Sequence, residues 1–195
     1  MNTRDQILTA IRAARERRTP VEHPGRFGGW RPVEPPPPLE GFEAMFTQAG
    51  GEVVHVSGTV ERDDWLRTFL AEFQHLSMGA GVPPGIADLG PTRINPGDEH
   101  AADVGVSMAR GAIAETGSLM MDARDGRRAQ LLPPVLVVLV DRSTVHATVA
   151  DAFESARGDL SAAIGLHSGP SKSADIGQVM VKGVHGPGRV IAVLA

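Results

Sequence analysis

The chain has 195 residues, 42% hydrophobic and 22% charged, which is the composition of an ordinary globular protein with one main domain. Its formal net charge of −4 and the lack of a dense basic run argue against a general nucleic-acid or anionic-membrane surface. The sequence contains no cysteine, so this chain makes no disulfide, offers no thiolate nucleophile and holds no cysteine-ligated iron–sulfur cluster.

The first 38 residues are expected to form an N-terminal helical arm followed by a proline-rich linker. Ile7 and Ile11 recur at helical spacing and predict a helix over residues 3–18. Four consecutive prolines at 35–38 predict an extended strap. The helix either docks a partner or braces the chain, and both interpretations stay open.

No segment predicts export or membrane insertion. The N-terminus lacks the apolar core of a secretory signal, and the longest apolar run, Val135 to Val140, is too short to span a bilayer. We therefore expect a cytoplasmic protein.

Helical and strand patterns alternate over residues 39–195, which are expected to form the main domain. Helices are predicted over 39–49, 61–76, 144–156 and 173–182, and strands over 53–56, 86–89, 135–140, 163–166 and 190–194, with two or three short strands inside 103–121. The run at 135–140 is apolar throughout, as in a strand buried on both faces of a parallel sheet. The pattern predicts an α/β fold, a three-layer sandwich with a mostly parallel sheet.

Glu115 is a lone carboxylate in a run of small and apolar residues, Ala112 to Ser118. A carboxylate in apolar surroundings has a raised pKa, which suits a general base or nucleophile. The following Thr116-Gly117 turn would let a ligand approach the backbone closely. The structural alternative is an ion pair with Arg127 or Arg128.

A second candidate segment runs from Ser168 to Ile176. Glycine and proline predict a turn there, after which Ser171 or Ser173 would cap a helix, with Asp175 in its first turn. Backbone N–H groups, hydroxyls and Lys172 at a helix start would form a cradle for phosphate or carboxylate. An ordinary capped helix with a solvated lysine explains the pattern equally well.

His185, in the loop from Gly183 to Gly188, is an acid–base candidate, or it fixes a tight loop through backbone hydrogen bonds. The seven histidines are scattered without metal-ligand spacing, so no metal site is expected. The sequence also lacks a nucleophile elbow, a dinucleotide fingerprint and a P-loop motif.

Four segments taken together resemble the LUD-domain family, and within it the lactate utilization protein C group. They are Ala114-Glu-Thr-Gly117, Leu131-Leu-Pro-Pro134, Ser168-Gly-Pro-Ser-Lys-Ser-Ala-Asp-Ile176 and Val184-His-Gly-Pro187. The resemblance covers roughly residues 42–195. It implies a fold like that of the ribose-5-phosphate isomerase, glucosamine-6-phosphate isomerase and CoA-transferase group.

The resemblance also implies a role in oxidation of L-lactate to pyruvate, in which this chain acts beside partner subunits that carry the iron–sulfur clusters. Under this reading the chain itself binds no cofactor. A small carboxylate or phosphate is the expected ligand, and a homo-oligomer is possible. The alternative is a stand-alone enzyme similar to CoA-transferases or sugar-phosphate isomerases, with Glu115 as nucleophile or base.

The site residues that these arguments nominate form two groups. Catalytic candidates are Glu115 and His185; ligand-binding candidates are Thr116, Gly117, Arg128, Ser171, Lys172, Ser173 and Asp175. Two positions depart from the family pattern. Lys172 stands where arginine is usual, which removes a planar two-pronged grip on a carboxylate, and Leu136 stands where the family often has histidine.

Overall fold

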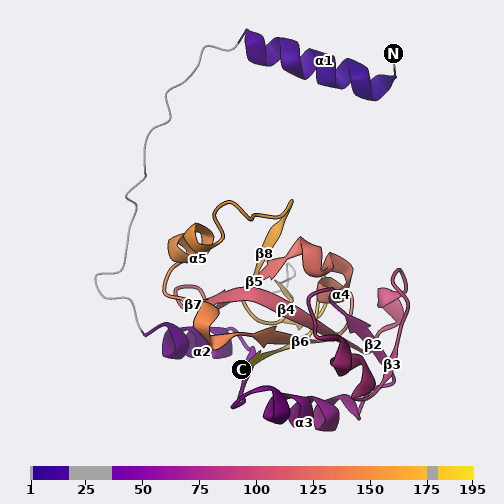
Figure 1. The fold of residues 1–195 in the computed structure, drawn as a ribbon, viewed down its shortest axis with the longest axis vertical. Coiled ribbons are helices and arrows are strands. Elements are labelled where there is room, and N and C mark those ends of the chain that lie inside the picture. The colour runs from indigo at the N-terminus through magenta and orange to yellow at the C-terminus, as the bar shows by residue number, and fades with distance from the viewer. Residues whose placement is uncertain (1, 18–36, 175–179) are drawn as a thin grey trace. The chain divides into compact units, whose positions relative to one another are not determined.

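The structure, a computed structural model, describes residues 2–17, 37–174 and 180–195. The chain divides into two compact units, Met1–Val33 and Glu34–Ala195. The first unit contains helix α1 (Thr3–Glu16) (Figure 1). The helix begins where the Asn2 side chain accepts a hydrogen bond from the Asp5 N–H at 2.9 Å. The predicted N-terminal helix is thus confirmed, and most of the proline-rich linker lies outside the described residues.

The second unit alternates helices and strands. Its α-helices are α2 (Pro38–Gln48), α3 (Thr59–Leu70), α4 (Arg127–Leu131) and α5 (Val149–Ser155). Its 3-10 helices are η1 (Pro84–Asp88), η2 (Glu99–Ala101), η3 (Ala123–Asp125) and η4 (Arg142–Thr144). Its strands are β1 (Glu52–His55), β2 (His75–Met78), β3 (Thr92–Arg93), β4 (Val104–Ile113), β5 (Ser118–Asp122), β6 (Val135–Val140), β7 (Val145–His146), β8 (Ile164–His167), β9 (Lys172–Ala174), β10 (Met180–Lys182) and β11 (Arg189–Leu194).

The main sheet is mixed and largely parallel. Its parallel part has the order β1-β11-β6-β4-β2-β3. The ten-residue strand β4 belongs to two parts of the sheet: Val104–Met108 pairs in parallel with β6, and Ala109–Ile113 pairs antiparallel with β5, with a register shift between Ala109 and Gly111. Strand β8 then pairs antiparallel with β5. The predicted α/β fold is therefore confirmed, with an antiparallel extension built on β4.

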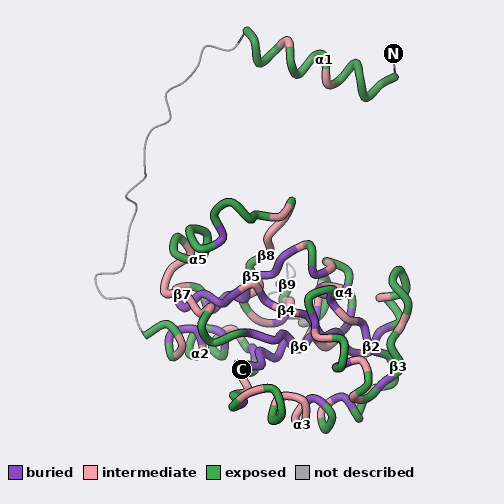
Figure 2. Tube along the Cα trace, viewed as in Figure 1, coloured by how far each residue is buried: buried purple, intermediate pink, exposed green. Residues whose placement is uncertain are grey.

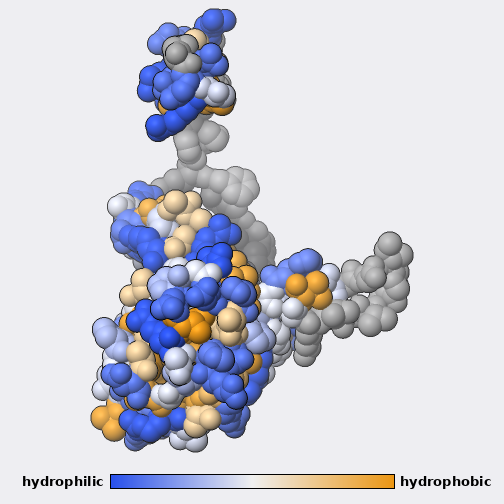
Figure 3. Space-filling model, turned by 90° about the vertical axis from the view of Figure 1, so that its right-hand side faces the viewer, coloured by the Kyte–Doolittle hydropathy of each residue, from blue (hydrophilic) through white to orange (hydrophobic). Residues whose placement is uncertain are grey.

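Apolar side chains cover both faces of the central strands. In β6, Leu136 and Val138 pack with Phe42 and Phe46 of α2, whereas the alternate residues Val137 and Leu139 belong to the cluster that contains Leu66 and Leu70 of α3. Side chains of successive strand residues point to opposite faces, so α2 covers one face and α3 the other. Figure 2 shows this buried centre along β4, β5 and β6, and the face in Figure 3 is mainly hydrophilic.

Two predicted helix boundaries and one predicted strand are wrong. In the two helices, residues at one end form a strand instead; in the predicted strand, the apolar run was too short to define its structure. Helix α3 ends at Leu70, not 76, since residues 75–78 form β2, which pairs with β3 and β4. The predicted strand at 86–89 is instead the 3-10 helix η1, which begins at Pro84, a residue suited to a first helical turn. Helix α5 begins at Val149, not 144, because β7 pairs with β4.

The predicted helix over 173–182 is also wrong. Lys172–Ala174 and Met180–Lys182 form an antiparallel pair, β9 and β10, and residues 175–179 lie outside the described residues. The helix start that would have formed the anion cradle does not exist at Ser171–Ser173. Within the described ranges, no helix is long and apolar enough to cross a membrane.

Candidate functional site

The turn between β4 and β5, residues Ala114–Gly117, is seated on the backbone of α2. Gly117 has φ +58°, and a Cβ atom at this position would lie 2.5 Å from the Phe46 nitrogen and 2.6 Å from the Met45 carbonyl carbon. Only glycine fits such a close approach in a left-handed conformation. The group that lies against Gly117 is therefore the α2 backbone, and the approach of a ligand to this turn stays a prediction.

A chain of hydroxyl groups joins this turn to the second predicted segment. The Ser118 hydroxyl lies 2.7 Å from that of Thr116 and 2.6 Å from that of Ser168. Gly169 follows with φ +85°, and a Cβ atom there would lie 3.2 Å from the Ala49 carbonyl oxygen, just beyond α2. Two motifs about fifty residues apart in sequence therefore meet beside the C-terminal end of α2.

Glu115 itself is directed to the start of α5. Its Oε2 accepts a hydrogen bond from the Val149 N–H at 2.9 Å, and its own N–H donates to the Ala147 carbonyl at 3.0 Å. The half-buried carboxylate thus satisfies a free N–H of the first helical turn. The expected structural partner, Arg127 or Arg128, is replaced by this backbone group.

Lys172 and Ser171 hold the second segment in place. The Lys172 ammonium donates to the Ala49 carbonyl, one of the free carbonyls at the end of α2. Ser171 donates its N–H to the Pro187 carbonyl at 2.8 Å and accepts the Gly183 N–H at 2.9 Å. The His185 N–H lies 3.4 Å from the Ser171 hydroxyl, so these two candidates do come together.

The remaining candidates separate. Arg128 donates to Glu99 Oε2 at 2.7 Å and to the Gly97 carbonyl at 2.8 Å, away from the hydroxyl chain. Hydrogen bonds from the Arg128 guanidinium and the Gly97 N–H lower the pKa of Glu99 to about 2. Ser173 lies in β9, and Asp175 lies outside the described residues.

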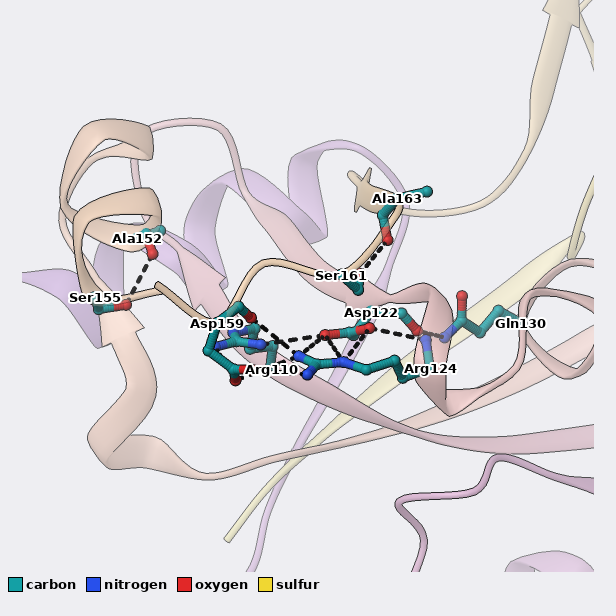
Figure 4. A network of polar contacts seen from close by, with 9 residues as sticks. All are labelled: Arg110, Asp122, Arg124, Gln130, Ala152, Ser155, Asp159, Ser161 and Ala163. Carbon is teal, nitrogen blue, oxygen red and sulfur yellow. Dashed lines mark hydrogen bonds and ion pairs between the residues drawn. The ribbon is translucent and has the colours of Figure 1, made fainter. Parts of the chain in front are cut away.

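Sequence reasoning missed a group of four charged side chains, Arg110, Asp122, Arg124 and Asp159, which Figure 4 shows together. Asp122 accepts from Arg110 Nη1 at 3.2 Å and from Arg124 Nη2 at 2.6 Å, and its side chain is only 11% exposed. Asp159, in the loop after α5, accepts from Arg110 Nη2 and Arg124 Nη1, both at 2.8 Å.

Ion pairing favours the ionised forms of Asp122 and Asp159. Hydrogen bonds, first from Arg124 and then from Arg110, hold the pKa of Asp122 far below its usual range and that of Asp159 at about 2. Arg110 stands at the register shift between β4 and β5, and bulges redirect side chains next to functional sites; this feature comes from the strand pairing and not from the sequence pattern.

A cavity of about 330 Å³ adjoins the charged group and is lined by Ala80, Gly81, Met108, Ala109, Arg110, Asp122, Arg124 and Asp125. The buried Asp125 carboxylate accepts the Gly81 N–H at 2.7 Å and the Met108 N–H at 3.1 Å. The cavity lies just past the carboxyl end of β2, the usual place for ligands in open α/β sheets.

A smaller cavity of about 130 Å³ lies between β8 and α4, and His167, Gln130 and Arg127 are among its lining residues. Burial lowers the pKa of His167, so its imidazole is neutral at pH 7.

In the part of the chain that the structure describes, no cluster of three or more metal-ligating side chains is found.

Comparison with known proteins identifies the family. Residues 98–195 match the LUD domain. A protein from Deinococcus radiodurans named Lactate utilization protein C is 31% identical over 163 residues, which are 78% of this chain and 76% of that protein. Lactate utilization protein C 1 from Bacillus mycoides is 34% identical over 102 residues, 48% of this chain and 44% of that protein.

The fold is shared with a crystal structure of a DUF162 family protein from Deinococcus radiodurans, with a TM-score of 0.61 and 21% identity. That match covers 84% of this chain and 99% of the other. The alignments to two of the curated relatives, from Bacillus mycoides and Shouchella clausii, span only 44% and 41% of those proteins. On the strength of the domain match and the Deinococcus alignment, the chain belongs to the LUD-domain family.

Proposed function

We propose that this protein is a cysteine-free component of a lactate utilization system, which oxidises L-lactate to pyruvate, and that it binds a small carboxylate while partner subunits carry the iron–sulfur clusters. The observation that carries the proposal is the alignment with the Deinococcus protein named Lactate utilization protein C, which extends over 78% of this chain. The lack of cysteine supports the division of labour, because cluster ligation needs thiolates.

We propose further that residues 39–195 have the three-layer arrangement of the ribose-5-phosphate isomerase and CoA-transferase group, and that residues 1–38 form an N-terminal helix and linker. The placement of α2 and α3 on opposite sheet faces supports the first point. The alternative of a stand-alone enzyme that uses Glu115 gains no support from its geometry, because the carboxylate accepts the Val149 N–H in the first turn of α5.

The decisive experiment is growth of a deletion strain on L-lactate or on pyruvate as the only carbon source. We expect loss of growth on lactate, normal growth on pyruvate, and rescue by the full chain. Purification of the tagged chain should bring down iron–sulfur partners. A deletion strain that grew on lactate as fast as its parent would rule out the proposed function.

A further inference from the structure

We propose that Arg110 and Arg124 form a carboxylate-binding site at the cavity past β2, and that the Asp159 side chain occupies the position that the ligand's carboxylate takes. Asp159 thus acts as a built-in competitor that the ligand displaces. The choice of L-lactate and pyruvate as ligands rests on the proposed function, whereas the site itself rests on the geometry that follows.

The two arginines present a carboxylate-shaped set of donors. Arg124 Nη1 donates to Asp159 Oδ1 and Arg110 Nη2 donates to Oδ2, each at 2.8 Å, and Arg124 Nη2 also lies 3.4 Å from Oδ2. Paired, charge-assisted N–H groups of this kind recognise planar carboxylates. The position favours a negative charge, as the low pKa of Asp159 indicates.

Asp122 keeps the two arginines in place independently of Asp159. It accepts hydrogen bonds from Arg110 Nη1 and from both Nε and Nη2 of Arg124, and it is almost fully buried. Displacement of Asp159 therefore leaves the arginines oriented, which is the preorganisation that a binding site needs. An incoming carboxylate would face the same two guanidinium groups that Asp159 contacts now.

Asp159 itself is held far less firmly. Its side chain is 65% exposed and lies in the loop between α5 and β8. Ion pairs this exposed contribute little stability, so a ligand can replace the contact at small cost.

The cavity beside the arginines fits a small aliphatic carboxylate. Apart from its charged residues, it is lined by Ala80, Gly81, Met108 and Ala109, which are small or apolar. A methyl group such as that of lactate or pyruvate suits these walls, and the two arginines supply the donors that its carboxylate needs. The other carboxylate in the cavity, Asp125, is already satisfied by two backbone N–H groups.

The test is isothermal titration calorimetry of pyruvate, L-lactate, acetate and inorganic phosphate into the purified full chain and its variants. Asp159→Asn keeps the shape of the side chain and removes its charge. If the Asp159 carboxylate is away from the arginines in roughly one molecule in ten, removal of its charge should tighten carboxylate binding about tenfold. Adding Arg124→Gln to this variant should abolish the gain.

Glu52→Gln is the matched control. Glu52 forms a two-pronged ion pair with Arg189, at 2.7 and 2.8 Å, and its side chain is 48% exposed; Arg189, unlike Arg110 and Arg124, does not line the cavity. Glu52→Gln removes one negative charge, as Asp159→Asn does, but it should not tighten carboxylate binding. A second measurement is NMR spectroscopy of the wild-type chain during an acetate titration. The Nε–H signals of Arg110 and Arg124 should both shift.

The inference is overturned if Asp159→Asn binds carboxylates no more tightly than Glu52→Gln does, or if its higher carboxylate affinity survives the addition of Arg124→Gln. It is also overturned if Asp159→Asn raises the affinity for phosphate alone. Failure of the proposed function would give a different combination of growth and binding results. A deletion strain that grows on lactate, combined with tenfold tighter acetate binding by Asp159→Asn, would discard the pathway and keep the site.

Discussion

Gly117→Ala should destabilise the protein by separating the β4–β5 turn from α2. An alanine held at φ +58° costs roughly 1–2 kcal/mol. Its methyl group would lie 2.5 Å from the Phe46 nitrogen, a backbone atom that cannot rotate away, and overpacking of this kind costs about 1–3 kcal/mol. The total is therefore roughly 2–5 kcal/mol of lost unfolding free energy.

Gly158→Ala separates the two contributions. Gly158 has φ +84°, and no atom lies within 4 Å of an added Cβ, so only the conformational cost applies. Urea unfolding followed by circular dichroism gives both free energies, with the m-value checking that the unfolded state is unchanged. Equal losses in the two variants would refute the close contact between Gly117 and α2.

Three further predictions concern charged groups. Glu115→Gln should keep nearly full stability because the amide oxygen still accepts the Val149 N–H, whereas Glu115→Ala should lose about 1 kcal/mol in thermal or urea unfolding; equal stability of the two would contradict this hydrogen bond. Lys172→Met should lose about 1 kcal/mol as the Ala49 carbonyl loses its donor, with Lys172→Arg as the control that retains one, and equal losses in the two variants would contradict the contact. Glu99 has its pKa lowered to about 2 by Arg128, so this carboxylate stabilises the fold above its ordinary value near 4.5, and the benefit fades as pH falls toward 2. The stability difference between the wild type and Glu99→Gln should therefore be largest at neutral pH and shrink below pH 4.5, and a difference that stays constant down to pH 2 would contradict this linkage.

Local pattern was enough to predict those elements whose residues face one environment along their whole length. β6 is apolar at every position because both its faces are covered, and its predicted bounds are the observed ones. The helix at 39–49 was likewise predicted from its own period and its glycine stop. The four family motifs were also readable in the sequence, because each depends on residue type and short-range spacing.

Tertiary structure alone decided where long-range pairing competes with local preference. Residues 75–78 and 145–146 became strands because β4 offered them partners, and residues 172–174 paired with 180–182 instead of starting a helix. The charged group combines positions 110, 122, 124 and 159, whose meeting depends on a bulge and on the loop after α5. Charge pairs formed between distant segments carry no periodic signal, so this site becomes visible only in the folded chain.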